Sequence, residues 1–271
     1  MKSMNILKLS VLVVLLASTL FGDVYYARVE PYEVRKISSN VMGVVLYTDE
    51  DMIGERLSKK PYIKIDAVLD KEELRVTQAK LAIIEDTLKV NTEVLKNLEA
   101  SLVKKRVNYE RVKELNIKSS VEKDREFYEL VASENSYLAT LKEVNTLKSQ
   151  KEDLKLREAQ LERSIHDKYL VAEDFTLYSI DVKVGQVVSK GTPLATLMNT
   201  KKALLTIYLS ASDLQDAKKR AIYIDGEKSR LKIDRVLNIA DSKNISKYKA
   251  QIIMDAPKTF SKLVKVELRD E

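Results

Sequence analysis

The stretch LRVTQAKLAIIEDTLKVNTEVLKNLEASLVKKRVNYERV, residues 74–112, decides the fold of this chain of 271 residues. It lies in a longer segment, residues 62–184, that contains no glycine and no proline, the two residues that most often break helices. Large side chains recur every seven positions, with a second series three residues later, and these steps of three and four predict a helical seam. The first series is Leu74, Leu81, Leu88, Leu95, Leu102 and Tyr109, and the second is Thr77, Ile84, Asn91, Leu98, Lys105 and Val112.

A second seam returns toward the C-terminus. Its residues are Val144, Leu147, Lys151, Leu154, Glu158, Leu161 and Ile165, and Leu130, Tyr137, Leu138 and Leu141 continue it less regularly upstream. Residues 116–120 are the segment between the seams that suits a reversal. Ser119 and Glu122 have the spacing of a capping box, which predicts that a second helix begins there.

The two seams are of similar length on either side of the reversal, which favours a self-closed antiparallel coiled-coil hairpin over residues 69–166. A coiled coil that dimerises with another chain remains the alternative, because heptads do not identify the partner helix. A first helix of about 45 residues would be on the order of 70 Å long. An arm of that length must protrude from any domain that this chain can form. Polar seam residues such as Asn91 are expected to fix the register.

Short β patterns flank the helical segment. Ile180, Val182 and Val184 alternate with polar residues before turns at Gly185 and Gly191, and residues 41–65 are a weak copy of this pattern. We expect residues 23–68 and 167–200 to form two halves of one β domain that meet when the hairpin closes. Residues 201–271 are rich in strand formers, with strands expected at 204–209, 221–224, 231–236, 249–254 and 263–268. The predicted fold class is therefore α+β.

The first 22 residues have the pattern of a secretory signal: lysines at the start, an apolar run from Leu9 to Phe21, and Gly22 at a potential cleavage site. An uncleaved anchor in the inner membrane is the alternative. The chain has no cysteine, which excludes a disulfide scaffold and a lipoprotein anchor. These features predict a periplasmic protein. The 47 basic and 41 acidic residues are interleaved, as on solvated helix faces, and argue against binding of nucleic acid.

The order of these segments, together with GQVVSKGTPL at residues 185–194, resembles the periplasmic adaptor subunits, or membrane fusion proteins, of bacterial tripartite efflux pumps of the resistance-nodulation-division type. The resemblance implies a lipoyl-like fold for the split domain and a β-barrel-like domain at residues 201–271. It also implies an inner-membrane transporter and an outer-membrane duct as partners, and a ring of copies, often six.

Lipoyl and biotinyl carriers share the same glycine-containing string, but they need a modified lysine between the two halves of the domain. Here the helical segment occupies that place, and Met198–Lys201 follows the second half. We therefore expect no covalently attached cofactor.

The resemblance also suggests a site at the reversal. Many adaptors of this type carry an arginine, a leucine four residues later and a serine beyond the turn, and these residues contact the outer-membrane duct. In this chain Arg111 and Leu115 keep the spacing, while Ser119 and Ser120 lie nearer than the family serine does. In the alternative interpretation Arg111 is a solvated helix residue, Leu115 belongs to the seam, and Ser119 only caps the second helix.

Few residues suggest catalysis. His166 is the only histidine, no cysteine accompanies it, and no phosphate-binding glycine loop or nucleophile motif is present. We expect no metal site, no cofactor and no enzymatic activity. The favoured function is an adaptor in transmembrane export. The alternatives are a structural coiled-coil protein of the periplasm and an adaptor of a type-I secretion system.

Overall fold

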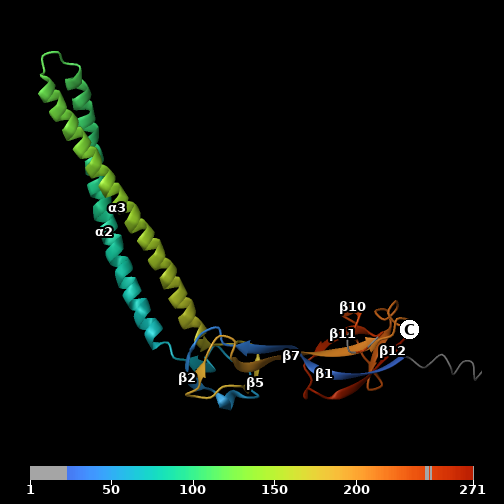
Figure 1. Ribbon diagram of the computed structural model, residues 1–271. Helices are drawn as coiled ribbons and strands as arrows, with labels where there is room; N and C mark the ends of the chain where they lie inside the picture. The colour runs from blue at the N-terminus through green and yellow to red at the C-terminus, as the bar shows by residue number, and fades with distance from the viewer. Residues whose placement is uncertain (1–22, 242–243, 245, 271) are drawn as a thin grey trace, which may run out of the picture.

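The computed structural model describes residues 23–241, 244 and 246–270, so the signal predicted at residues 1–22 lies outside the described residues. The molecule combines two long α-helices with antiparallel sheets. The helices form an arm at one end, and the sheets form two β regions that follow one another (Figure 1). No helix in the described ranges has the length and apolar character needed to span a membrane.

The arm consists of α2 (Val68–Lys113) and α3 (Ser120–Asp167), which run away from the sheets and back again side by side (Figure 1). The 46 residues of α2 extend over ~69 Å at about 1.5 Å per residue. Every predicted seam residue of α2 is buried or half-buried, and every other α2 residue from Lys71 onward is exposed. The predicted facing side of this helix is therefore confirmed.

In α3 the predicted seam residues from Val144 to Ile165 are also shielded from solvent. In the irregular upstream part of the seam, Leu130, Tyr137 and Leu141 are buried or half-buried, as predicted. Leu138 is exposed and does not belong to the seam. A helix turns by about 100° per residue, so two adjacent positions cannot both occupy the centre of a narrow seam.

Polar contacts between the helices hold them in one register. The Asn91 amide donates to Glu143 Oε1 at 3.0 Å, and Lys151 Nζ lies 2.9 Å from Glu85 Oε1. Nearer the tip, Lys105 Nζ lies 3.4 Å from a Glu129 carboxylate oxygen. Within this chain α2 and α3 therefore pack against each other along the arm.

The β region next to the arm draws on both flanks of the helices. Its four-stranded sheet has the order β4-β3-β2-β6, and β5 pairs with the long strand β7. Its core combines Val45 and Ile63 from the upstream flank with Leu177, Val188 and Leu194 from the downstream flank. The bounds are β2 (Gly43–Thr48), η1 (Glu50–Met52), β3 (Ile63–Ile65), β4 (Tyr169–Leu170), β5 (Thr176–Ile180) and β6 (Val187–Val188).

The second β region is built on two long strands that also reach into the first. Its sheet has the order β10-β11-β7-β1-β12-β8-β9, and these neighbouring strands all pair antiparallel. Its core includes Leu205, Ile222, Ile252 and Val266. The bounds are β1 (Asp23–Ser38), β7 (Pro193–Leu209), β8 (Ala221–Ile224), β9 (Glu227–Lys228), β10 (Arg235–Ala240), β11 (Tyr248–Asp255) and β12 (Leu263–Arg269).

The expected boundary of the first region at residue 23 differs from the structure. Ala27 and Val29, in the first half of β1, are buried in the core of the second region. The cause is the pairing of β1, which bonds to β12 over residues 23–28 and to β7 from Val29 onward. One continuous strand therefore belongs to both cores.

The β-barrel-like expectation also requires a correction. Among the described residues no pairing joins the edge strands β9 and β10, so the sheet is open. The strand expected at 231–236 begins only at Arg235, as β10. Residues 229–234 form no strand and connect β9 to β10. Ile233 is buried in the core, so its apolar pattern reflects core filling rather than strand pairing.

Candidate docking site at the arm tip

The tip of the arm is a tight turn between α2 and α3. The last turn of α2 closes with the Leu115 amide donating to the Val112 carbonyl at 3.1 Å, and α3 begins at Ser120. Lys123, in the first turn of α3, donates from Nζ to the carbonyl of Lys113 at 3.0 Å. This bond satisfies a carbonyl that the end of α2 would leave without a helical partner, and it joins the two helices at the tip.

The predicted capping box at the start of α3 is confirmed. The Glu122 amide donates to Ser119 Oγ at 3.3 Å, and the Glu122 carboxylate accepts from the Ser119 amide at 3.0 Å. Lys118 Nζ donates to the same carboxylate at 2.9 Å. The Lys118 hydrogen bond, followed by those from Ser119, lowers the pKa of Glu122 to about 2. The turn is thus held by charge-assisted hydrogen bonds at neutral pH.

The structure brings the four sequence-predicted site residues to one end of the molecule. Arg111 lies in the last turn of α2, Leu115 in the connection, and Ser119 and Ser120 at the start of α3. All four are exposed. They differ in availability, because the Ser119 hydroxyl is engaged in the capping box. Arg111 forms no ion pair within the described part of the chain, so its guanidinium is open to a partner.

Sequence reasoning missed two apolar residues at the tip. Ile117, in the connection, is 89% exposed, and Val121, in the first turn of α3, is 75% exposed, although both are β-branched aliphatic residues. The sequence could have indicated both residues, because they are apolar and fall outside the two heptad seams, so pairing of the helices does not account for them. Together with Leu115 they give the tip an apolar component that the capping box presents on a rigid frame.

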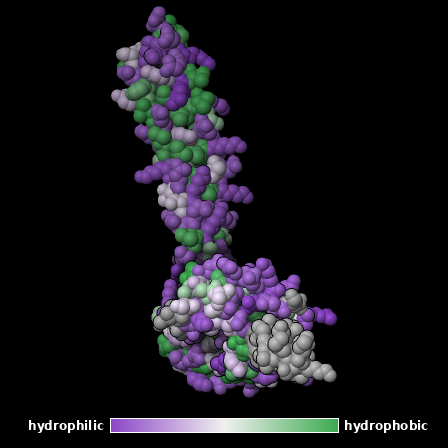
Figure 2. Space-filling view, turned by 90° about the vertical axis from the view of Figure 1, so that its right-hand side faces the viewer, coloured by the Kyte–Doolittle hydropathy of each residue, from purple (hydrophilic) through white to green (hydrophobic). Residues whose placement is uncertain are grey.

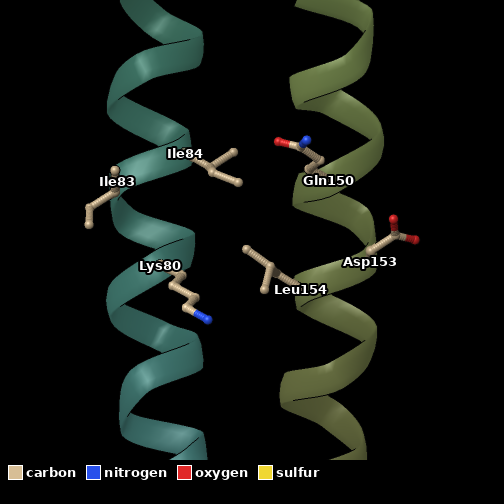
Figure 3. Close-up of a pocket in the computed structure, with 6 residues that line it drawn as sticks. All are labelled: Lys80, Ile83, Ile84, Gln150, Asp153 and Leu154. Atoms are coloured by element: carbon tan, nitrogen blue, oxygen red, sulfur yellow. The ribbon is translucent and has the colours of Figure 1, made fainter.

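The side of the arm carries a groove of about 400 Å³ between the helices. Ile84 and Leu154 extend toward the facing helix, while Lys80 and Asp153 lie at the margin (Figure 3). The remaining lining residues are Ile83 and Gln150. Hydrophobic side chains gather along one face of the arm in the space-filling view (Figure 2). The surface of the groove is almost entirely apolar, as on a packing surface.

The base of the arm holds the single histidine. His166 Nδ1 lies 3.3 Å from an oxygen of Asp167, and its side chain is largely exposed. Within residues 23–241, 244 and 246–270, no group of three or more His, Cys, Asp or Glu side chains is placed to hold a metal ion.

Solved structures show what this arrangement resembles, although no family model and no curated protein sequence matches the chain. MacA from Actinobacillus actinomycetemcomitans superposes with a TM-score of 0.66 at 16% identity, over 93% of this chain and 79% of MacA. The membrane fusion protein Spr0693 from Streptococcus pneumoniae R6 superposes with a TM-score of 0.63 at 10% identity, over 92% of this chain and 99% of Spr0693.

A putative efflux transporter from Bacteroides eggerthii is similar as well, with a TM-score of 0.56 at 15% identity, over 93% of this chain and 69% of the other. At such identities the likeness concerns the fold. It covers the arm and both β regions at once, because more than nine-tenths of the chain is aligned in each case. The chain therefore has the fold of the membrane fusion proteins, the periplasmic adaptor family that its sequence resembles.

Proposed function

We propose that this chain is a periplasmic adaptor that links an inner-membrane efflux transporter to an outer-membrane duct and acts in transmembrane export. One observation carries the proposal: an exposed, hydrogen-bonded tip stands ~69 Å from the β regions at the end of an arm of two packed helices. The arm then bridges periplasmic distance, while the β regions contact the transporter. The mechanism is geometric and requires no chemistry by the chain.

The domain assignments belong to this proposal. Residues 1–22 are the export signal, residues 69–166 the antiparallel coiled-coil hairpin, and residues 23–68 and 167–200 supply the lipoyl-like domain. The first half of β1 joins residues 201–271 in the open-sheet region beyond it. The seam burial supports the coiled coil, and the shared core of the two flanks supports the split domain. Copies of the chain assemble side by side into a ring, for which six is the expected number.

At the tip, we propose that Arg111, Leu115 and Ser120 contact the duct together with Ile117. Ser119 contributes by holding the turn, because its hydroxyl and amide both bond Glu122. A rigid contact surface loses little conformational entropy on binding, so a small tip can still bind specifically.

Site-specific cross-linking tests the proposal, since the chain has no cysteine and a single introduced thiol is unique. Lys113→Cys places the thiol at the tip, and Lys89→Cys, also exposed on α2, places it halfway along the arm as the matched control. We expect the tip thiol, but not the control, to capture an outer-membrane duct protein in cells. Capture of only further copies of this chain from both positions would refute the adaptor function and favour a structural coiled-coil protein.

A further inference from the structure

The outer face of β1 and β12 carries exposed apolar and basic side chains next to each other. Val24, Tyr26 and Arg28 are exposed on β1, whereas the alternate residue Ala27 is buried in the core. On β12 the residues of this face include Leu263 and Lys265. Side chains alternate between the faces of a strand, so these five residues share one surface, which we call the β1–β12 face.

The strand register places the two kinds of side chain in adjacent pairs. Tyr26 lies opposite Lys265, and Arg28 lies opposite Leu263. Tyr26 is 67% exposed and Leu263 is 63% exposed, so neither adds to the core beneath. Farther along β12, Glu267 pairs with Lys265 and with Arg269. Glu30 follows Arg28 on the same side of β1, so this side carries three basic and two acidic side chains.

The charge of the whole chain is concentrated in the same region. Residues 201–271 contain 16 lysines and arginines against 10 aspartates and glutamates, which accounts for the full net charge of +6. The first 200 residues are balanced, with 31 of each sign. A region with such an excess is attracted to anionic surfaces, whereas the arm, with its interleaved charges, is not.

The position of the face relative to the N-terminal segment gives a second argument. β1 begins at Asp23, directly after the apolar run Leu9–Phe21 and Gly22 in the sequence. Its first residues lie beside β12 at the end of the molecule opposite the arm (Figure 1). A segment that enters the inner membrane during export therefore delivers this face, rather than the arm, to the membrane surface.

We propose that the β1–β12 face binds the surface of a bilayer that contains anionic phospholipids, and so keeps the chain at the inner membrane independently of its N-terminal segment. Tyrosine suits this role because its ring is apolar and its hydroxyl is polar, as at membrane–water interfaces. Arg28 contacts the anionic headgroups, whereas Lys265 is also paired with Glu267 and contributes mainly to the local potential. This binding is separate from docking at the tip, so either can fail without the other.

Fluorescence provides a direct test, because the chain contains no tryptophan. Tyr26→Trp reports from the face, and Tyr178→Trp is the matched control, since Tyr178 is 60% exposed in the other β region. The protein used is residues 23–271, which retains every described helix and strand. With vesicles of phosphatidylglycerol and brominated phosphatidylcholine, we expect strong quenching for Tyr26→Trp and little for Tyr178→Trp. Equal quenching of the two, or none, would overturn the proposal.

Flotation with the same vesicles, without bromine, tests the charges. Arg28→Gln is expected to weaken binding about fivefold, the usual effect of one basic residue near an anionic surface, and added salt should weaken it further. Lys190→Gln, at an exposed turn of the first β region, is the control and should bind as the parent does. Equal binding to vesicles of phosphatidylcholine alone would refute the role of anionic lipid.

Discussion

The pairing of the arm with itself can be tested by one matched pair of substitutions in α3. Leu161 is 3% exposed and lies in the seam, between the Gln78–Glu158 and Asp70–Ser164 hydrogen bonds that join the helices. Leu156, five positions earlier in the same helix, is 61% exposed. Both residues become alanine, which preserves helix propensity, so the difference between the variants reports packing.

The expected magnitudes follow from burial. Leucine-to-alanine changes at buried sites cost roughly 2–5 kcal/mol, and a two-helix seam that can partly close should lie near 2–3 kcal/mol. Leu156→Ala should stay within about 0.5 kcal/mol of the parent. With a urea m-value of ~2 kcal/mol per M, Leu161→Ala lowers the unfolding midpoint by about 1–1.5 M.

Circular dichroism at 222 nm during urea unfolding follows this transition, because α2 and α3 supply the α-helical signal of the described residues. If both variants lose the same stability, the seam does not face α2 and the reasoning is refuted. A ring of copies would itself make the midpoint rise with protein concentration, so the two variants are compared at one protein concentration.

Three further predictions concern the tip and the first β core. The folded-state pKa of Glu122 is depressed to about 2, so its stabilisation of the tip is complete above about pH 4.5 and is lost as pH falls toward 2. The protection of the tip amides, measured as the exchange rate relative to the unfolded chain at the same pH, should fall over that range, and Glu122→Gln should abolish this pH dependence. Gly43→Ala should destabilise the fold by roughly 1–3 kcal/mol, because the added Cβ would lie 2.7 Å from Ile65 Cγ2. A thermal unfolding midpoint equal to that of the parent would contradict this packing. Ile117→Ser should leave the circular dichroism spectrum unchanged and abolish cross-linking of the tip thiol to the duct. The control is Ile83→Ser, because Ile83 is 65% exposed on the side of the arm, and this variant should retain the cross-linking. If both variants capture the duct equally, Ile117 does not belong to the site.

Local patterns predicted the arm well because its interactions are local or periodic. The heptad positions of α2 coincide with its shielded residues, and Ser119 with Glu122 forms the expected cap. The exposed Leu138 is the exception, and it lies where the seam pattern was irregular. The candidate site could be located from the sequence, because a reversal between two paired helices must lie at the tip. The residues that make up the site could not be predicted from the sequence, because the exposure of Ile117 is known only from the structure.

The sequence by itself determined the two helices, their facing sides and the cap that starts α3, since residue spacing and local hydrogen bonding set these features. The tertiary structure decided how the strands are shared. β1 passes from β12 to β7 and so joins two cores, and residues 229–234 fill a core without pairing, which leaves the sheet open. The physical reason is that strand pairing is made between residues far apart in the chain, where alternation shows which side is buried but not which strand is the neighbour.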